Sequence, residues 1–67
     1  MKFNKGDRIT GQPKTWYDGT PIKNWPDPQF IGTVRKAEYH HGLEMYRIKY
    51  DSGRLEWNTN TRLIKID

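Results

Sequence analysis

Aromatic and polar side chains suited to ligand binding stand close together in one stretch of the sequence. Trp16, Tyr17 and Trp25 lie in a segment rich in proline and glycine, and Asp18 and Asn24 stand beside them. Exposed rings stack on the face of a sugar or a peptide, and neighbouring carboxylate or amide groups orient its polar or cationic groups. The alternative is that the rings fold back and plug the mouth of a small domain, where each indole N–H needs a hydrogen-bond partner.

Catalytic and metal-binding chemistry has little support in the sequence. There is no cysteine, and Ser52, the only serine, stands in a predicted turn rather than beside a histidine. His40 and His41 with Glu38 offer metal ligands, but adjacent residues on a strand point to opposite faces, and no third ligand stands at a suitable spacing. We therefore expect no enzyme activity, no metal and no cofactor, with both histidines in an exposed loop.

Length and composition limit the fold. The chain has 67 residues and no cysteine, 33% of its residues are hydrophobic and 13% are aromatic. A chain of this length forms one domain, here residues 1–67, with a small core and no disulfide. No run approaches the roughly 18 apolar residues of a membrane helix, so we expect no membrane insertion.

The chain is basic, with 12 Lys and Arg residues against 8 Asp and Glu residues and a net charge of +4. Such a balance favours acidic partners, among them nucleic acid and anionic wall polymers. The bases mostly alternate with acids, as on a solvated mixed surface. Folding can still gather separate bases into a patch, and the candidates are Lys14, Lys23, Arg35 and Lys36.

Alternation between glycine and proline breaks predicts short strands and no long helix. The predicted strands are residues 8–10, 29–36, 45–50, 54–58 and 63–66. Gly32, inside the second strand, indicates a bulge or a close approach of another backbone. Residues 51–53 form a hairpin turn, with Asp51 as a turn residue, and the polar residues 58–62 close a single helical turn.

The strand pattern assigns further rings to the faces of the sheet. Tyr46 and Tyr50 share one face of the third strand, and the return strand places Leu55 and Trp57 inward. Phe30, Tyr46 and Trp57 are therefore expected to serve the core. Tyr46, Tyr50 and Trp57 can instead line the rim of a groove, with Tyr50 nearer the turn and therefore nearer the surface.

Five short strands cannot bury a core as an open flat sheet, and closure into a small barrel removes exposed edges. The predicted fold is an all-β, five-stranded SH3-like barrel with one short 3-10 turn near residues 58–62. Its long loop, residues 11–28, carries Trp16, Tyr17 and Trp25. Loops of this length in small domains are more often functional than idle.

Short motifs along nearly the whole chain match one family. They are Lys5-Gly6-Asp7-Arg8-Ile9, Lys14 to Ile22, Trp25, Phe30 to Val34, and Glu56-Trp57-Asn58 with Leu63 to Ile66. In these segments the chain resembles the bacterial SH3-like (SH3b) domains that target phage lysins and autolysins to the cell wall. Residues 26–28 and 40–42 depart from the family pattern, and both segments border the groove that the family uses.

This resemblance implies a non-catalytic module that binds peptidoglycan, at its peptide bridge or stem, through an aromatic groove. The groove would lie between loop 11–28 and the end of strand 54–58. Its ligand-binding residues would be Trp16, Tyr17, Asp18, Asn24, Trp25, Tyr50 and Trp57. As part of a lysin, the module would work outside the cell, at the wall.

A second resemblance covers the C-terminal half. Phe30 to Val34, Tyr46 to Gly53, Trp57 and Leu63 are similar to a Tudor-type barrel, which shares the SH3-like fold and holds a methylated Lys or Arg in an aromatic cage. It implies an intracellular interaction protein, Tudor-like or of a small phage type, that binds a host protein, a methylated side chain or nucleic acid. A stand-alone protein of this kind would be cytoplasmic.

Overall fold

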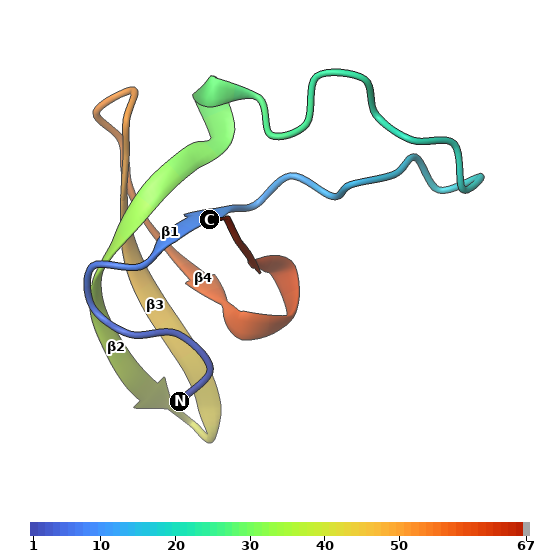
Figure 1. Ribbon diagram of the computed structural model, residues 1–67. Coiled ribbons are helices and arrows are strands. Elements are labelled where there is room, and N and C mark those ends of the chain that lie inside the picture. The colour runs from blue at the N-terminus through green and yellow to red at the C-terminus, as the bar shows by residue number, and fades with distance from the viewer. Residues whose placement is uncertain (67) are drawn as a thin grey trace.

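The computed structural model describes residues 1–66 and shows the all-β fold that the sequence predicts. Asp67, the last residue of the predicted domain, lies outside the described residues. The elements are β1 (Arg8–Thr10), η1 (Pro28–Phe30), β2 (Ile31–His40), β3 (Leu43–Tyr50), β4 (Leu55–Thr59), η2 (Asn60–Arg62) and β5 (Ile64–Lys65), where η marks a 3-10 turn. The strands form one antiparallel sheet in the order β4-β3-β2-β1-β5, bent into a small SH3-like barrel (Figure 1).

The second predicted strand begins later and runs further than expected. Residues 29 and 30 belong to η1, where the Asp27 carboxylate accepts a hydrogen bond from the Gln29 N–H at 3.0 Å. Phe30 is 39% exposed, so its predicted place in the core is wrong. The local cap turns the chain before β2 starts, and the ring leaves the sheet with it.

Gly32 lies where another strand approaches closely, which confirms the second of the two interpretations of this glycine. A Cβ atom at this position would stand 2.6 Å from Ile48 Cγ2 and 2.9 Å from the Lys49 carbonyl oxygen. The irregularity in the ladder falls elsewhere in β2, between Val34 and Lys36. Only a residue without a side chain lets β2 and β3 pack at this distance.

The core lies on the inner face of the coiled sheet. Its buried hydrophobic residues are Phe3, Ile9, Val34, Tyr46, Ile48, Tyr50 and Leu63. Tyr46 is fully buried and meets Phe3 edge to face, with ring centroids 5.2 Å apart. Aromatic rings therefore fill a large part of the interior of this short chain, as its composition predicts.

The side chains of β4 face the opposite way from the prediction. Trp57 pairs with Arg47 and Leu55 with Lys49, on the outer face of the sheet. The turn itself is residues 51–53 as predicted, because the Tyr50 N–H donates to the Arg54 carbonyl at 2.8 Å and sets these two residues opposite each other. Residues directly opposite each other lie on the same face of a sheet, so Glu56, opposite Ile48, takes the inner face. The inward placement of Leu55 and Trp57 is therefore wrong.

Candidate functional site

Residues 11–28, called the arm below, project from the barrel as a narrow extension (Figure 1). Its two sides pair through an antiparallel bridge between Thr15 and Pro21. The Trp16 N–H donates to the Thr20 carbonyl at 2.8 Å, which closes the tip. The loop that the sequence singles out is thus a folded hairpin-like element that holds its side chains away from the core.

The base of the arm is fixed by two hydrogen bonds to one residue. The Trp25 indole Nε1–H donates to the Gln12 carbonyl at 2.8 Å, and the Asp27 N–H donates to the Gln12 Oε1 atom at 2.8 Å. Trp25 is half-buried, with its polar atom satisfied. Its ring is therefore held at a fixed place against the barrel, while part of it faces solvent.

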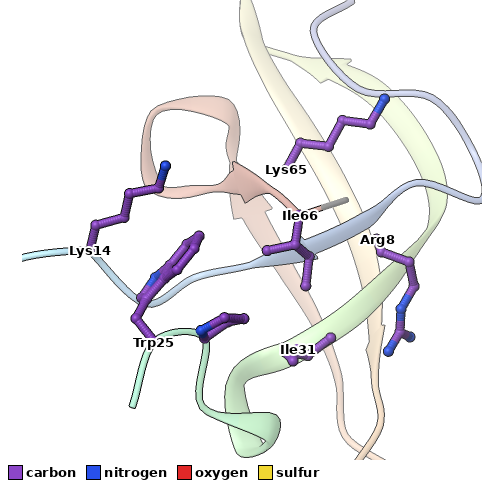
Figure 2. Close-up of a pocket in the computed structure, with 7 residues that line it drawn as sticks. Arg8, Lys14, Trp25, Ile31, Lys65 and Ile66 are labelled. Atoms are coloured by element: carbon purple, nitrogen blue, oxygen red, sulfur yellow. The ribbon is translucent and has the colours of Figure 1, made fainter. Parts of the chain in front are cut away.

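A pocket of about 540 Å³ opens between the base of the arm and the strands β1 and β5 (Figure 2). It is lined by Arg8, Lys14, Trp25, Pro26, Ile31, Lys65 and Ile66, and is called the basic pocket below. Figure 2 shows the Trp25 ring across from Ile66, with Lys14 and Lys65 pointing to one side and Arg8 to the other. The pocket combines cations with an apolar and aromatic lining.

The three cations of the basic pocket differ in how closely each is paired with an acidic side chain. Arg8 makes two hydrogen bonds to Asp51, from Nη1 to Oδ1 at 2.8 Å and from Nη2 to Oδ2 at 2.6 Å. Lys65 Nζ lies 3.8 Å from Asp7 Oδ1, at the limit of an ion pair. Lys14 Nζ stands 4.9 Å from the centroid of the Trp25 ring.

The Arg8–Asp51 pair stays ionised across the neutral range. The hydrogen bond from Arg8 lowers the pKa of the Asp51 carboxyl group, and the same bond raises the pKa of Arg8. Arg8 therefore contributes its side chain to the wall of the pocket more than its charge. Within residues 1–66 no acidic side chain lines this pocket, so Lys14 and Lys65 set its positive potential.

Two of the predicted binding residues meet in a second pocket, on the arm itself. This arm pocket, of about 390 Å³, is lined by Gln12, Trp16, Thr20, Pro21, Ile22, Lys23, Asn24 and Asp27. Trp16 is 57% exposed there. Tyr17 is fully exposed at the tip. The Asp18 carboxylate accepts the Thr20 N–H at 2.9 Å, and this bond lowers the pKa of Asp18, so Asp18 shapes the turn.

Tyr50 and Trp57 lie apart from the arm rings. Tyr50 is 4% exposed and belongs to the core. Trp57 lies on the outer face of β4, where its ring contacts His40 at 4.9 Å and Arg47 at 5.6 Å between group centres. The single groove implied by the family resemblance is therefore not assembled in this structure. Trp25 lines the basic pocket, Trp16 and Asn24 line the arm pocket, and the other predicted binding residues line neither: Tyr17, Asp18, Tyr50 and Trp57.

The basic pocket depends on residues that the sequence pattern did not single out as a set. Of the four bases considered as a patch, only Lys14 lines it. Arg8 and Lys65 come together because β1 pairs with β5, with Ile9 opposite Lys65. That pairing joins segments from the two ends of the chain, so no local spacing signals it.

Other features of the described chain add no site. His40 ends β2 and is half-buried, so its predicted place in an exposed loop is wrong, whereas His41 is exposed in the turn. His40 Nε2 lies 3.4 Å from Glu38 Oε2, and residues 1–66 contain no group of three side chains placed to hold a metal. No helix in the same range is long and apolar enough to cross a membrane.

Comparison of the chain with protein-family models, with curated proteins and with solved structures found no match.

Proposed function

We propose that the protein is a non-catalytic binding module that holds nucleic acid at the basic pocket. The observation that carries this proposal is a pocket that joins two lysines to a fixed indole and has no acidic lining residue, with Lys14 over the Trp25 ring and Lys65 3.8 Å from the Asp7 carboxylate. Nucleic acid offers the matching chemistry, since it joins phosphate charges to flat rings at regular spacing. The net charge of +4 adds long-range attraction to the same ligand.

Reversing both lysine charges of the pocket, with Lys14→Glu plus Lys65→Glu, is expected to weaken oligonucleotide binding about tenfold at low salt. The slope of log affinity against log salt should flatten by about two, because each lysine lost leaves one phosphate uncompensated. Fluorescence anisotropy of a labelled oligonucleotide at two salt concentrations measures both.

A matched control separates the pocket from the overall charge. Lys5→Glu plus Arg35→Glu also changes the net charge by −4, from +4 to 0, at exposed residues that line neither pocket. We expect a much smaller loss in this variant. Equal losses in both variants, or binding that does not depend on salt, would contradict the proposal.

A second candidate is binding of cell-wall peptidoglycan, which one observation favours. The arm presents Trp16 and Tyr17 to solvent, and Trp16 shares the arm pocket with Asn24. An exposed indole with amide and carboxylate neighbours suits a sugar face or a short peptide. This candidate uses the tip of the arm, whereas the nucleic-acid proposal uses its base.

If the wall is the ligand, Trp16→Ala plus Tyr17→Ala should reduce sedimentation of the protein with purified Gram-positive walls by about tenfold in affinity. Lys14→Glu plus Lys65→Glu should leave most of the wall binding in place. Unchanged sedimentation of the double alanine variant, or no sedimentation of the parent protein, would exclude this candidate.

A further inference from the structure

We infer that the basic pocket selects single-stranded nucleic acid, with one unpaired base stacked against Trp25. This inference rests on the proposed function and specifies its ligand. The evidence lies in the lining of the pocket, in the way Trp25 is held and in the placement of the two lysines.

The pocket lining fits the face of a base rather than its edge. Trp25, Ile31 and Ile66 are apolar, and their side chains border a space of about 540 Å³. Figure 2 shows the Trp25 ring opposite Ile66, with open space between the two side chains. In a duplex the faces of the bases are covered by their neighbours, so only an unpaired base brings a free face to such a surface.

Trp25 is prepared for stacking before any ligand arrives. Its N–H bond to the Gln12 carbonyl fixes the indole, and Gln12 is held in turn by the Asp27 N–H. A ring that is already oriented loses little conformational freedom when a base stacks on it. Trp16 and Tyr17, which are exposed near the tip, lack this support in the described hydrogen bonds of their side chains.

Lys14 has a different partner in the free protein and in the complex with nucleic acid. Its ammonium group stands 4.9 Å from the centroid of the Trp25 ring, where it makes a cation–π contact. A base that stacks on the ring contributes more binding free energy than this exposed cation–π contact. The flexible lysine side chain lets the ammonium group move from the ring to a phosphate. Lys65, across the pocket, is placed to meet the phosphate on the other side of the same nucleotide.

Fluorescence of Trp25 tests the stacking directly. Trp16→Phe plus Trp57→Phe leaves Trp25 as the only tryptophan, since the chain contains three. Three probes of equal length are compared: a thymidine oligonucleotide, an abasic strand with the same number of phosphates, and a duplex. We expect the thymidine strand to quench Trp25 emission and to bind about tenfold tighter than the abasic strand, with the duplex no tighter than the abasic strand.

A pair of substitutions separates stacking from anchoring of the arm. Trp25→Phe and Trp25→Leu both remove the N–H bond to Gln12, but only phenylalanine keeps a ring face. The preference for the thymidine strand over the abasic strand should persist with phenylalanine and disappear with leucine. Equal behaviour of the two variants would overturn the inference.

The failures of the two proposals are distinguishable. Equal, salt-dependent binding of the thymidine and abasic strands overturns the stacked base and leaves nucleic-acid binding in place. Tighter binding of the duplex also overturns single-strand selection. Absence of binding to all three probes overturns the proposed function itself.

Discussion

Gly32→Ala is expected to lower the free energy of unfolding by about 3 kcal/mol, at the upper end of what overpacking costs in a protein core. The added Cβ would stand 2.6 Å from Ile48 Cγ2, 2.9 Å from the Lys49 carbonyl oxygen and 3.1 Å from the Tyr50 Cα atom. Two of these atoms belong to the backbone of β3, so the strand itself must move. A domain of this size has only about 3–5 kcal/mol of stability from its core, so the variant should keep about 0–2 kcal/mol and unfold at a much lower urea concentration.

Gly11→Ala is the matched control. A Cβ at Gly11 would meet its nearest neighbour, the Tyr50 hydroxyl oxygen, at 3.6 Å, which is an ordinary contact. We expect this variant to be neutral or slightly more stable, by about 0.5 kcal/mol, because alanine restricts the unfolded chain. Urea unfolding followed by circular dichroism measures both variants. Similar stabilities for the two would show that β2 and β3 can separate at Gly32 without penalty.

The elements with a clear local pattern were predictable from the sequence. β1, Arg8–Thr10, has the predicted bounds, and η2 lies within the polar segment predicted to form a helical turn. Tyr46 and Ile48 share a buried face of β3 as the alternation predicts, and Tyr50, predicted to line a binding groove, is buried on the same face. In these segments the hydrophobic period alone decides which face is buried, so local sequence is sufficient.

The sequence predicts the wrong position for two side chains, Trp57 and Phe30. Trp57 faces outward because the turn at residues 51–53 sets Glu56 opposite the buried Ile48 and Trp57 opposite Arg47. Phe30 leaves the core because Asp27 caps a 3-10 turn in front of it. The pairing with β3 decides the orientation of Trp57 and one local hydrogen bond decides the position of Phe30, and the hydrophobic pattern of each segment shows neither.

The candidate site was predictable only in part, because pairing between distant segments of the chain assembles it. The sequence places Trp25 in a long loop and identifies it as a binding residue, and the structure places it in a pocket. The charges around it come from β1 and from the end of the chain, because β5 pairs with β1. Trp16 lies in the arm pocket and Trp25 in the basic pocket, and no motif in the sequence predicts this separation.

Tyr46→Phe is expected to lower the free energy of unfolding by about 2 kcal/mol, although it removes a single oxygen atom. The Tyr46 hydroxyl donates to Glu44 Oε1 and accepts the Phe3 N–H at 3.1 Å. Glu44 also accepts the Lys2 N–H at 2.8 Å and the Asn60 side-chain amide at 3.3 Å. The substitution leaves the buried Phe3 N–H without its acceptor and loosens the tie between the N-terminal segment and β3.

The same substitution should change how stability depends on pH. The hydrogen bond from Tyr46, followed by the bond from the Lys2 N–H, lowers the pKa of the Glu44 carboxyl group in the folded protein. A depressed pKa stabilises the fold above the unfolded value of about 4.3, and this contribution is lost as pH falls through the folded pKa. Without the hydroxyl the folded pKa rises toward its ordinary value, so the contribution of Glu44 shrinks.

The difference between parent and Tyr46→Phe should therefore be larger at pH 7 than at pH 3, because the stability that the lowered pKa of Glu44 contributes declines once the pH falls below the unfolded value of about 4.3. Urea unfolding at the two pH values measures this difference. Tyr39→Phe is the control, since Tyr39 is 62% exposed and its hydroxyl makes no hydrogen bond to the described residues. A difference that does not depend on pH would mean that Tyr46 acts through Phe3 alone, and an unchanged stability at pH 7 would mean that the N-terminal segment is held by packing instead.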